Sequence, residues 1–179
     1  TNRWYWRFDR RRLDAESIRD GILQTSGVLN PNRPGPHPFP AESTWQFSQH
    51  GPFKAIYDSP YRSVYLMTQR IQRHPFLALF DGADPSRVTS QRKHTAVALQ
   101  ALYLRNSPFI HQQSEKLAQR LLDTLSDPRQ RITRAIQRAW SRDPTTSEID
   151  DALNYITTFA DHMKLAGKSA PRQVAPQLM

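Results

Sequence analysis

Apolar residues recur at helical spacing in four stretches of the chain, and each stretch is bounded by residues that begin or end helices. In the first, residues 14–26, Ala15, Ile18 and Ile22 share one face and Gly27 supplies the stop. The second stretch begins with the Ser-Pro pair at residues 107–108, and the third with the Asp-Pro pair at residues 127–128. The fourth begins with a Thr-x-x-Glu capping box at residues 145–148. We therefore expect further helices over residues 107–126, 127–140 and 145–167.

Two shorter helices are expected in the middle of the chain. Pro75 suits the first turn of a short apolar helix that closes before Gly82. Thr95 is the expected cap of the next helix, which runs to about Arg105. Its close-packing face is predicted to consist of Ala98, Ala101 and Leu102.

Between the first helix and Pro75 the pattern changes. Residues 28–60 hold seven of the fourteen prolines, which excludes helix and central strand there. Residues 53–57 can pair with residues 62–67 around Asp58-Ser59-Pro60. The fold expected is mainly α: four to five helices in an irregular bundle, with a small antiparallel β-hairpin and a long proline-rich ordered loop. We expect one helical domain over residues 1–167 and a mobile tail over residues 168–179.

The net charge and the absence of cysteine limit the kinds of partner and of site that the chain can have. The formal net charge of +9 favours an anionic partner such as a polysaccharide, a nucleic acid, a membrane surface or an acidic protein, unless it is only a solvated surface. Absence of cysteine excludes thiolate nucleophiles, thiolate metal sites and CxxCH haem attachment in this chain. The six histidines are scattered without metal-ligand spacing, so no metal or cofactor site is expected. No stretch is apolar enough to span a bilayer.

The candidate catalytic residues lie immediately before the short helix at Pro75 and on the loop that follows it. Carboxylates and imidazoles near one another can bind a divalent cation or exchange protons with a substrate. The alternative is structural, because Asp81 can cap its segment and Asp84 precedes Pro85 in an ordinary turn. The candidates are His74, Asp81, Asp84 and His94.

Arginines supply the candidate anion-binding residues. A guanidinium is a planar fork of donors that suits sulfate, phosphate and carboxylate, although structural pairing with nearby carboxylates is the alternative. Three of these arginines are expected to align as a ridge opposite the apolar face of the helix over residues 127–140. The full set is Arg62, Arg70, Arg73 and Arg92 around the loop, and Arg131, Arg134 and Arg138 on the ridge.

Five ordered motifs carry a family resemblance. They span residues 10–20, 34–40, 52–57, 62–81 and 100–109, and include RRRLDAESIRD and RSVYLMTQRIQRHPFLALFD. With these motifs the chain resembles a planctomycete-specific family of unknown function, found C-terminally in large exported proteins that often carry a cytochrome c-type domain. Because residues 10–20 and 62–81 dominate the resemblance, we expect them to touch, with Glu16 or Asp20 paired to an arginine of the second block.

The resemblance implies an extracytoplasmic parent protein, with haem in another part of it. The chain starts at Thr1 without a methionine, so we expect a longer parent whose N-terminal segment or companion domain is a partner. Exposed aromatic residues would mark that contact, and the candidates are Trp4, Trp6, Trp45 and Phe47.

Three functions remain in order of preference. The first is a non-catalytic binding or interaction module that contacts an anionic polymer. The second is an enzyme domain acting on an anionic, sulfated polysaccharide through the loop candidates. The third is nucleic-acid binding, which aromatic and basic residues interleaved near the N-terminus would suit.

Overall fold

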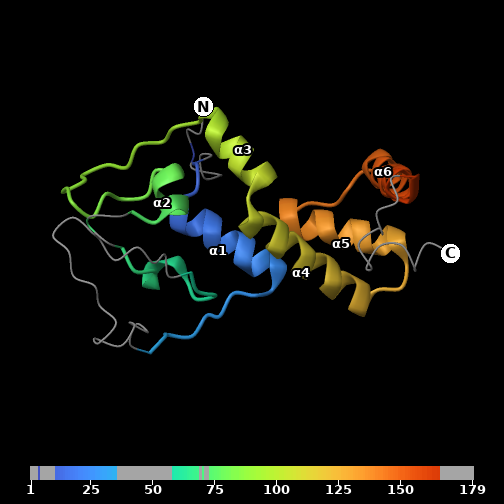
Figure 1. The fold of residues 1–179 in the computed structure, drawn as a ribbon, viewed down its shortest axis with the longest axis horizontal. Coiled ribbons are helices and arrows are strands. Elements are labelled where there is room, and N and C mark those ends of the chain that lie inside the picture. Colours follow the sequence, from blue (N-terminus) through green and yellow to red (C-terminus); the bar gives the residue numbers. More distant parts are fainter. Residues whose placement is uncertain (1–3, 5–10, 36–57, 69, 71–72, 166–179) are drawn as a thin grey trace. The chain divides into compact units, whose positions relative to one another are not determined.

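The computed structural model describes residue 4 and residues 11–35, 58–68, 70 and 73–165 (Figure 1). The chain divides into two compact units, one formed by residues 1–24 and 28–110 and the other by residues 25–27 and 111–179. The regular elements are α1 (Ala15–Ser26), the 3-10 helix η2 (Ser63–Tyr65), α2 (Pro75–Leu79), α3 (Ala98–Asn106), α4 (Pro108–Thr124), α5 (Pro128–Trp140) and α6 (Thr146–Leu165).

The helix α1 confirms the first predicted element and its stop signal. The Asp14 carbonyl accepts the first intrahelical hydrogen bond, from the Ile18 N–H at 2.9 Å. At the other end Gly27 has φ +78°, a left-handed conformation that glycine adopts without steric cost. The Val28 N–H then donates to the Leu23 carbonyl at 2.9 Å, which is the bond of a Schellman motif.

An aromatic cluster forms the core of the first unit. The Phe76 ring stacks on Phe80 at 4.6 Å between centroids and meets Tyr103 and Phe109 edge-on at 5.6 and 6.0 Å. Ala15 of α1 is fully buried against the same cluster. Edge-to-face and offset-stacked pairs are the arrangements that the ring quadrupole favours, so the cluster gains more than its area burial.

The short helix α2 ends in a tight turn formed by Asp81 and Gly82. Asp81 has φ +64°, and the Gly82 N–H donates to the Leu77 carbonyl at 2.6 Å. A Cβ on Gly82 would lie 2.7 Å from that carbonyl oxygen, which is closer than any ordinary contact. The predicted end of this helix before Gly82 is therefore confirmed, and a close backbone approach explains the glycine.

The buried guanidinium of Arg19 organises the segment that precedes α2. Arg19 is 2% exposed, and its Nη2 donates to the Ser59 carbonyl at 2.8 Å and to Asp58 Oδ1 at 3.1 Å. Its Nη1 lies 3.5 Å from the Tyr61 carbonyl and 3.3 Å from Ser63 Oγ. Loop carbonyls that lack a strand partner are thus satisfied by one side chain from α1.

This arrangement corrects the predicted hairpin. Residues 62–67, expected as its second strand, instead contain η2, and residues 53–57 lie outside the described part of the chain. Among the described residues the only β-type pairing is an isolated parallel bridge between Asn30 and Tyr61. Apolar alternation over so few residues suits an extended segment equally well, and here the hydrogen bonds go to Arg19 and Asp20.

The two blocks that dominate the family resemblance do touch, as expected, but with the charges reversed. Asp20 Oδ1 accepts from the Ser63 N–H at 2.7 Å and from its hydroxyl at 2.6 Å, and not from an arginine. Glu16 pairs with Arg92, which lies beyond the second block. The charged contact between the blocks joins Arg12 of the first to Asp81 of the second, at 3.4 Å.

The helix α3 begins later than predicted and presents another face inward. Thr95 does not cap it, because its N–H and hydroxyl both donate to Asp81. The buried residue of α3 is Gln100, whose side-chain amide donates to the Leu79 carbonyl at 2.8 Å and accepts from Arg12 at 2.9 Å. The predicted packing face is wrong, since its three residues, Ala98, Ala101 and Leu102, are exposed.

In the second unit, local capping signals determine where the helices start. Asp127 accepts the backbone N–H groups of Arg129 and Gln130 at the start of α5. Thr145 and Glu148 exchange side-chain-to-backbone bonds at 2.9 and 3.3 Å before α6, which confirms the capping box. Hydrogen bonds from Arg142 and from Thr145 lower the pKa of Glu148 to about 2.

Other expectations fall partly outside the described residues. The described chain is mainly helical with six α-helices, where four to five were predicted. Trp4 is 80% exposed. Trp6, Trp45 and Phe47 are not among the described residues, and neither are residues 36–57 of the proline-rich loop or the tail over residues 168–179. The predicted partner contact and the domain boundaries stay predictions.

Replacement of Arg19 by methionine should destabilise the chain by about 2–4 kcal/mol, because it leaves buried loop carbonyls without donors. Urea denaturation of the full chain measures this change. Arg33→Met, at an exposed arginine, is the control and should shift stability by less than about 0.5 kcal/mol. Equal effects of the two substitutions would show that Arg19 does not hold the loop.

Two glycine-to-alanine substitutions should act in opposite directions. Gly21 lies inside α1 with no atom within 4 Å of an added Cβ, so alanine should stabilise by about 0.5–1 kcal/mol. At Gly82 the added Cβ meets a backbone oxygen, and a loss of about 1–3 kcal/mol is expected. Denaturation midpoints of both variants test the turn geometry, and a stabilised Gly82→Ala would contradict it.

Candidate anion-binding site

Asp81 of the candidate loop serves the fold. Its carboxylate accepts from the Thr95 N–H at 2.8 Å and from the Thr95 hydroxyl at 2.8 and 3.0 Å, and pairs with Arg12. Burial pushes the pKa of Asp81 up, but the Thr95 hydrogen bonds and the charges of Arg12 and His94 outweigh it and hold the pKa below its usual value. Most of its acceptor capacity is therefore used within the protein.

The other three loop candidates have separate environments. Asp84 accepts the Ser86 N–H at 3.0 Å in its own turn, and His94 is exposed. His74 is buried at the start of α2, and its Nε2 lies 3.2 Å from Asp58 Oδ1. The pKa of Asp58 is lowered, first by the hydrogen bond from His74 and then by the charge of Arg19. The polar pair formed here is His74 with Asp58, which the sequence did not indicate.

The arginines around the loop also divide into separate roles. Arg92 pairs with Glu16 at 2.5 Å, and that hydrogen bond is the main reason its pKa is raised. Arg73 donates to the Gly82 carbonyl at 2.6 Å and so supports the α2 turn. Arg62 and Arg70 have exposed side chains. Two of the four arginines are thus committed to structural partners.

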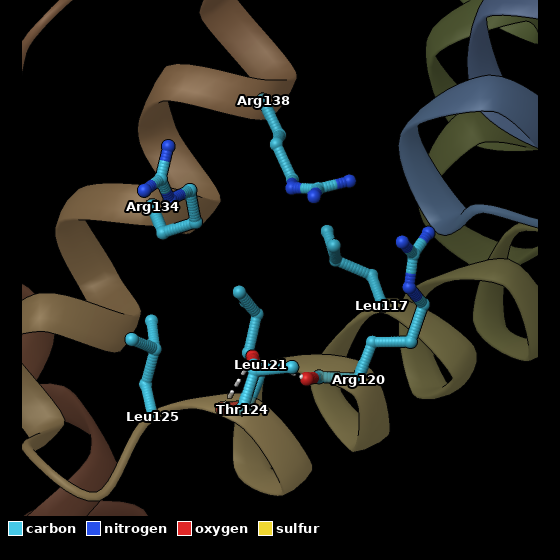
Figure 2. Close-up of a pocket in the computed structure, with 7 residues that line it drawn as sticks. All are labelled: Leu117, Arg120, Leu121, Thr124, Leu125, Arg134 and Arg138. Atoms are coloured by element: carbon cyan, nitrogen blue, oxygen red, sulfur yellow. Dashed lines mark hydrogen bonds between the residues drawn. The ribbon is translucent and has the colours of Figure 1, made fainter.

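The expected arginine ridge on α5 splits in two. Arg131 turns back to the preceding turn, where its Nε donates to the Leu125 carbonyl at 2.7 Å and its Nη2 to the Ser126 carbonyl at 2.6 Å. Arg134 and Arg138 instead line a cavity together with Arg120 of α4 (Figure 2). Arg120 was missed, and the only signal for it is its position between two leucines of the α4 stripe.

This cavity, the arginine pocket, has a volume of about 350 Å³. One side is apolar, and there the three leucines follow α4 and the turn after it. Figure 2 shows Arg138 reaching from α5 toward Leu117, with Arg134 one turn earlier on the same helix. Its lining residues are Leu117, Arg120, Leu121, Thr124, Leu125, Arg134 and Arg138.

Glycine at position 27 leaves room for Arg120 beside the pocket. A Cβ on Gly27 would lie 1.3 Å from Arg120 Nη1, so the guanidinium occupies the space that any other residue would fill. The same glycine also needs its positive φ to end α1. Because the Arg120 side chain is exposed and flexible, it could move aside, and the positive φ is the stronger constraint on Gly27.

The composition of the pocket favours binding over catalysis. Its lining contains no carboxylate, imidazole or amine, and the Thr124 hydroxyl donates to the Arg120 carbonyl at 2.7 Å. No hydrogen bond or ion pair joins the three guanidinium groups to another described residue. Guanidinium groups beside an apolar wall can hold an anion, but they offer no group to take or give a proton at neutral pH.

Stability should fall as the pH drops through the acid range because of Asp58 and Asp81. Both carboxylates have a pKa in the folded chain below the ordinary value of 3.8, so they contribute stability above that pH and lose it progressively below. Asp81→Asn retains a residue that tolerates the left-handed conformation and should make this pH dependence shallower.

Urea denaturation between about pH 5 and pH 2 measures the dependence. Thr95→Val removes the hydroxyl donor but keeps the backbone N–H, and should give an intermediate curve. Identical curves for the native chain and both variants would show that the Asp81 contacts do not stabilise its ionised form.

Two further features are absent from the described residues. No group of three or more histidine, aspartate or glutamate side chains there is arranged to hold a metal ion. No helix in that part of the chain is both long and apolar enough to cross a membrane.

Comparison with known proteins identifies the family of the chain. No curated protein and no solved structure matches it. A family model described as a protein of unknown function (DUF1553), also named PSD1, matches residues 1–156, which is most of the sequence. The chain therefore belongs to the DUF1553 family, PSD1.

Proposed function

We propose that this chain is a non-catalytic binding module that contacts an anionic polymer through the arginine pocket. The observation that carries the proposal is the gathering of Arg120, Arg134 and Arg138 around one cavity whose lining has no carboxylate. Cations without a partner among the described residues can bind an external anion. The net charge of +9 adds a long-range attraction for such a polymer.

The loop residues weigh against the enzyme alternative. A general acid or base must reach the reacting group with free hydrogen-bonding capacity. Asp81 is committed to Thr95 and Arg12, and Asp84 to its own turn. The pocket itself contains no group that titrates near neutral pH. Binding accounts for these observations with fewer assumptions than catalysis.

The wider context of the module belongs to the same proposal. We place it in a larger extracytoplasmic protein, next to a companion domain that exposed aromatic residues such as Trp4 contact. Any haem of that parent lies outside this chain, which has no cysteine for its attachment.

The test is the affinity of the full chain for heparin across a salt series. Binding should weaken steeply with salt, by analogy with counterion release from nucleic acids. Arg134→Glu with Arg138→Glu should weaken binding at low salt by about tenfold or more and reduce the slope of log K against log salt by about two.

The matched control is Arg87→Glu with Lys93→Glu, which changes the net charge equally at two exposed loop positions. It should leave most of the affinity intact. If both double variants weaken binding equally, bulk charge and not the pocket binds the polymer. If the native chain ignores heparin at low salt, the proposed function is wrong.

A further inference from the structure

The arginine pocket has an apolar half that a purely ionic ligand would not use. Leu117, Leu121 and Leu125 lie at intervals of four residues, so they form one row along α4 and its C-terminal turn. Leu121 is buried, whereas Leu117 and Leu125 are half-buried and border the cavity. A sulfated sugar presents hydroxyl and sulfate groups that gain nothing from such a wall.

The cationic side repeats the same spacing. Arg134 and Arg138 are four residues apart on α5, which corresponds to a rise of about 6 Å along that helix. The leucine row extends over eight residues, or about 12 Å if helical throughout. A ligand that fits both rows needs apolar groups along one edge and anions about one helical turn apart along the other.

We propose, building on the proposed function, that the pocket receives an acidic amphipathic helix of a partner protein. Glutamate or aspartate side chains at i and i+4 of such a helix are about one turn apart and can meet Arg134 and Arg138. Leucine-sized side chains on its adjacent face contact Leu117 and Leu125. An amphipathic helix in an apolar groove is a recurrent mode of peptide recognition.

The pocket suits this partner better than a membrane. Its volume of about 350 Å³ is at the lower end for ligand sites and accommodates one or two side chains. Only three arginines line it, and a lipid surface is usually held by a broader field of four or more basic residues. The arrangement therefore matches a local contact of about two helical turns.

The experiment uses a labelled synthetic peptide and the full chain, with anisotropy as the readout. The peptide is a helix of about four turns with glutamates and leucines on adjacent faces, and its control is a scrambled peptide of the same composition. We expect the amphipathic peptide to bind at least about tenfold more tightly than the scrambled one, since only the former aligns both rows.

Two variants separate the apolar wall from the charge. Leu117→Gln, at a half-buried position of the pocket lining, should weaken peptide binding about fivefold or more, and by a clearly larger factor than it weakens heparin binding. Leu104→Gln, at an exposed leucine of α3, is the matched control and should change neither. Circular dichroism of each variant confirms that the chain remains folded.

The outcomes distinguish this inference from the proposed function. If Arg134→Glu with Arg138→Glu abolishes heparin binding but the two peptides bind alike, or Leu117→Gln has no effect, the helix-binding inference is wrong and the anion-binding function stands. If the arginine variants affect neither ligand, both fail. If vesicles of phosphatidylglycerol bind more tightly than the peptide and lose binding with Leu117→Gln, the occupant is a lipid surface and the inference is overturned.

Discussion

The first unit depends on a single buried cation. Arg19 projects from α1 and supplies donors to the Ser59 and Tyr61 carbonyls, which accept no backbone hydrogen bond from another described residue. Because an unpaired backbone carbonyl inside a protein costs as much as a lost hydrogen bond, the position of that loop is tied to the arginine. The guanidinium also lies 5.5 Å from the Phe109 ring centroid, so the polar network and the aromatic core share one side chain.

A second polar junction gives Asp81 of the candidate loop a structural role. Asp81 has the left-handed backbone conformation that ends α2, and its carboxylate binds Thr95 and Arg12. Hydrogen bonds and a nearby cation keep its pKa low, which makes it a poor proton donor and a weak base near neutral pH. Gln100 completes the junction by joining Arg12 to the Leu79 carbonyl. Asp81, one of the four catalytic candidates, therefore helps to hold α1, α2 and the segment leading into α3 together.

Features that depend on neighbours in sequence were predictable, whereas those that depend on distant residues were not. The stop at Gly27, the cap at Asp127 and the capping box at Thr145 involve groups within a few positions, and each is confirmed. The predicted strand over residues 62–67 was wrong, because the segment leading into it is bound by Arg19, which lies about 40 residues earlier in the sequence. The inward face of α3 failed for the same reason, since Gln100 is buried by partners that only the fold brings close.

The candidate site shows the same division between what neighbouring residues and what distant residues determine. The amino-acid composition predicted an anionic partner, but it did not indicate which arginines could bind that partner. In the second unit Arg129 and Arg142 pair with Asp150 and Glu148, while Arg131 donates to backbone carbonyls. Each such contact removes a cation from competition for external anions. The arginines of α4 and α5 that have no such contact with another described residue all lie at one cavity, namely Arg120, Arg134 and Arg138. These three guanidinium groups and the row of leucines border the same cavity, and that coincidence distinguishes the pocket from an ordinary basic surface.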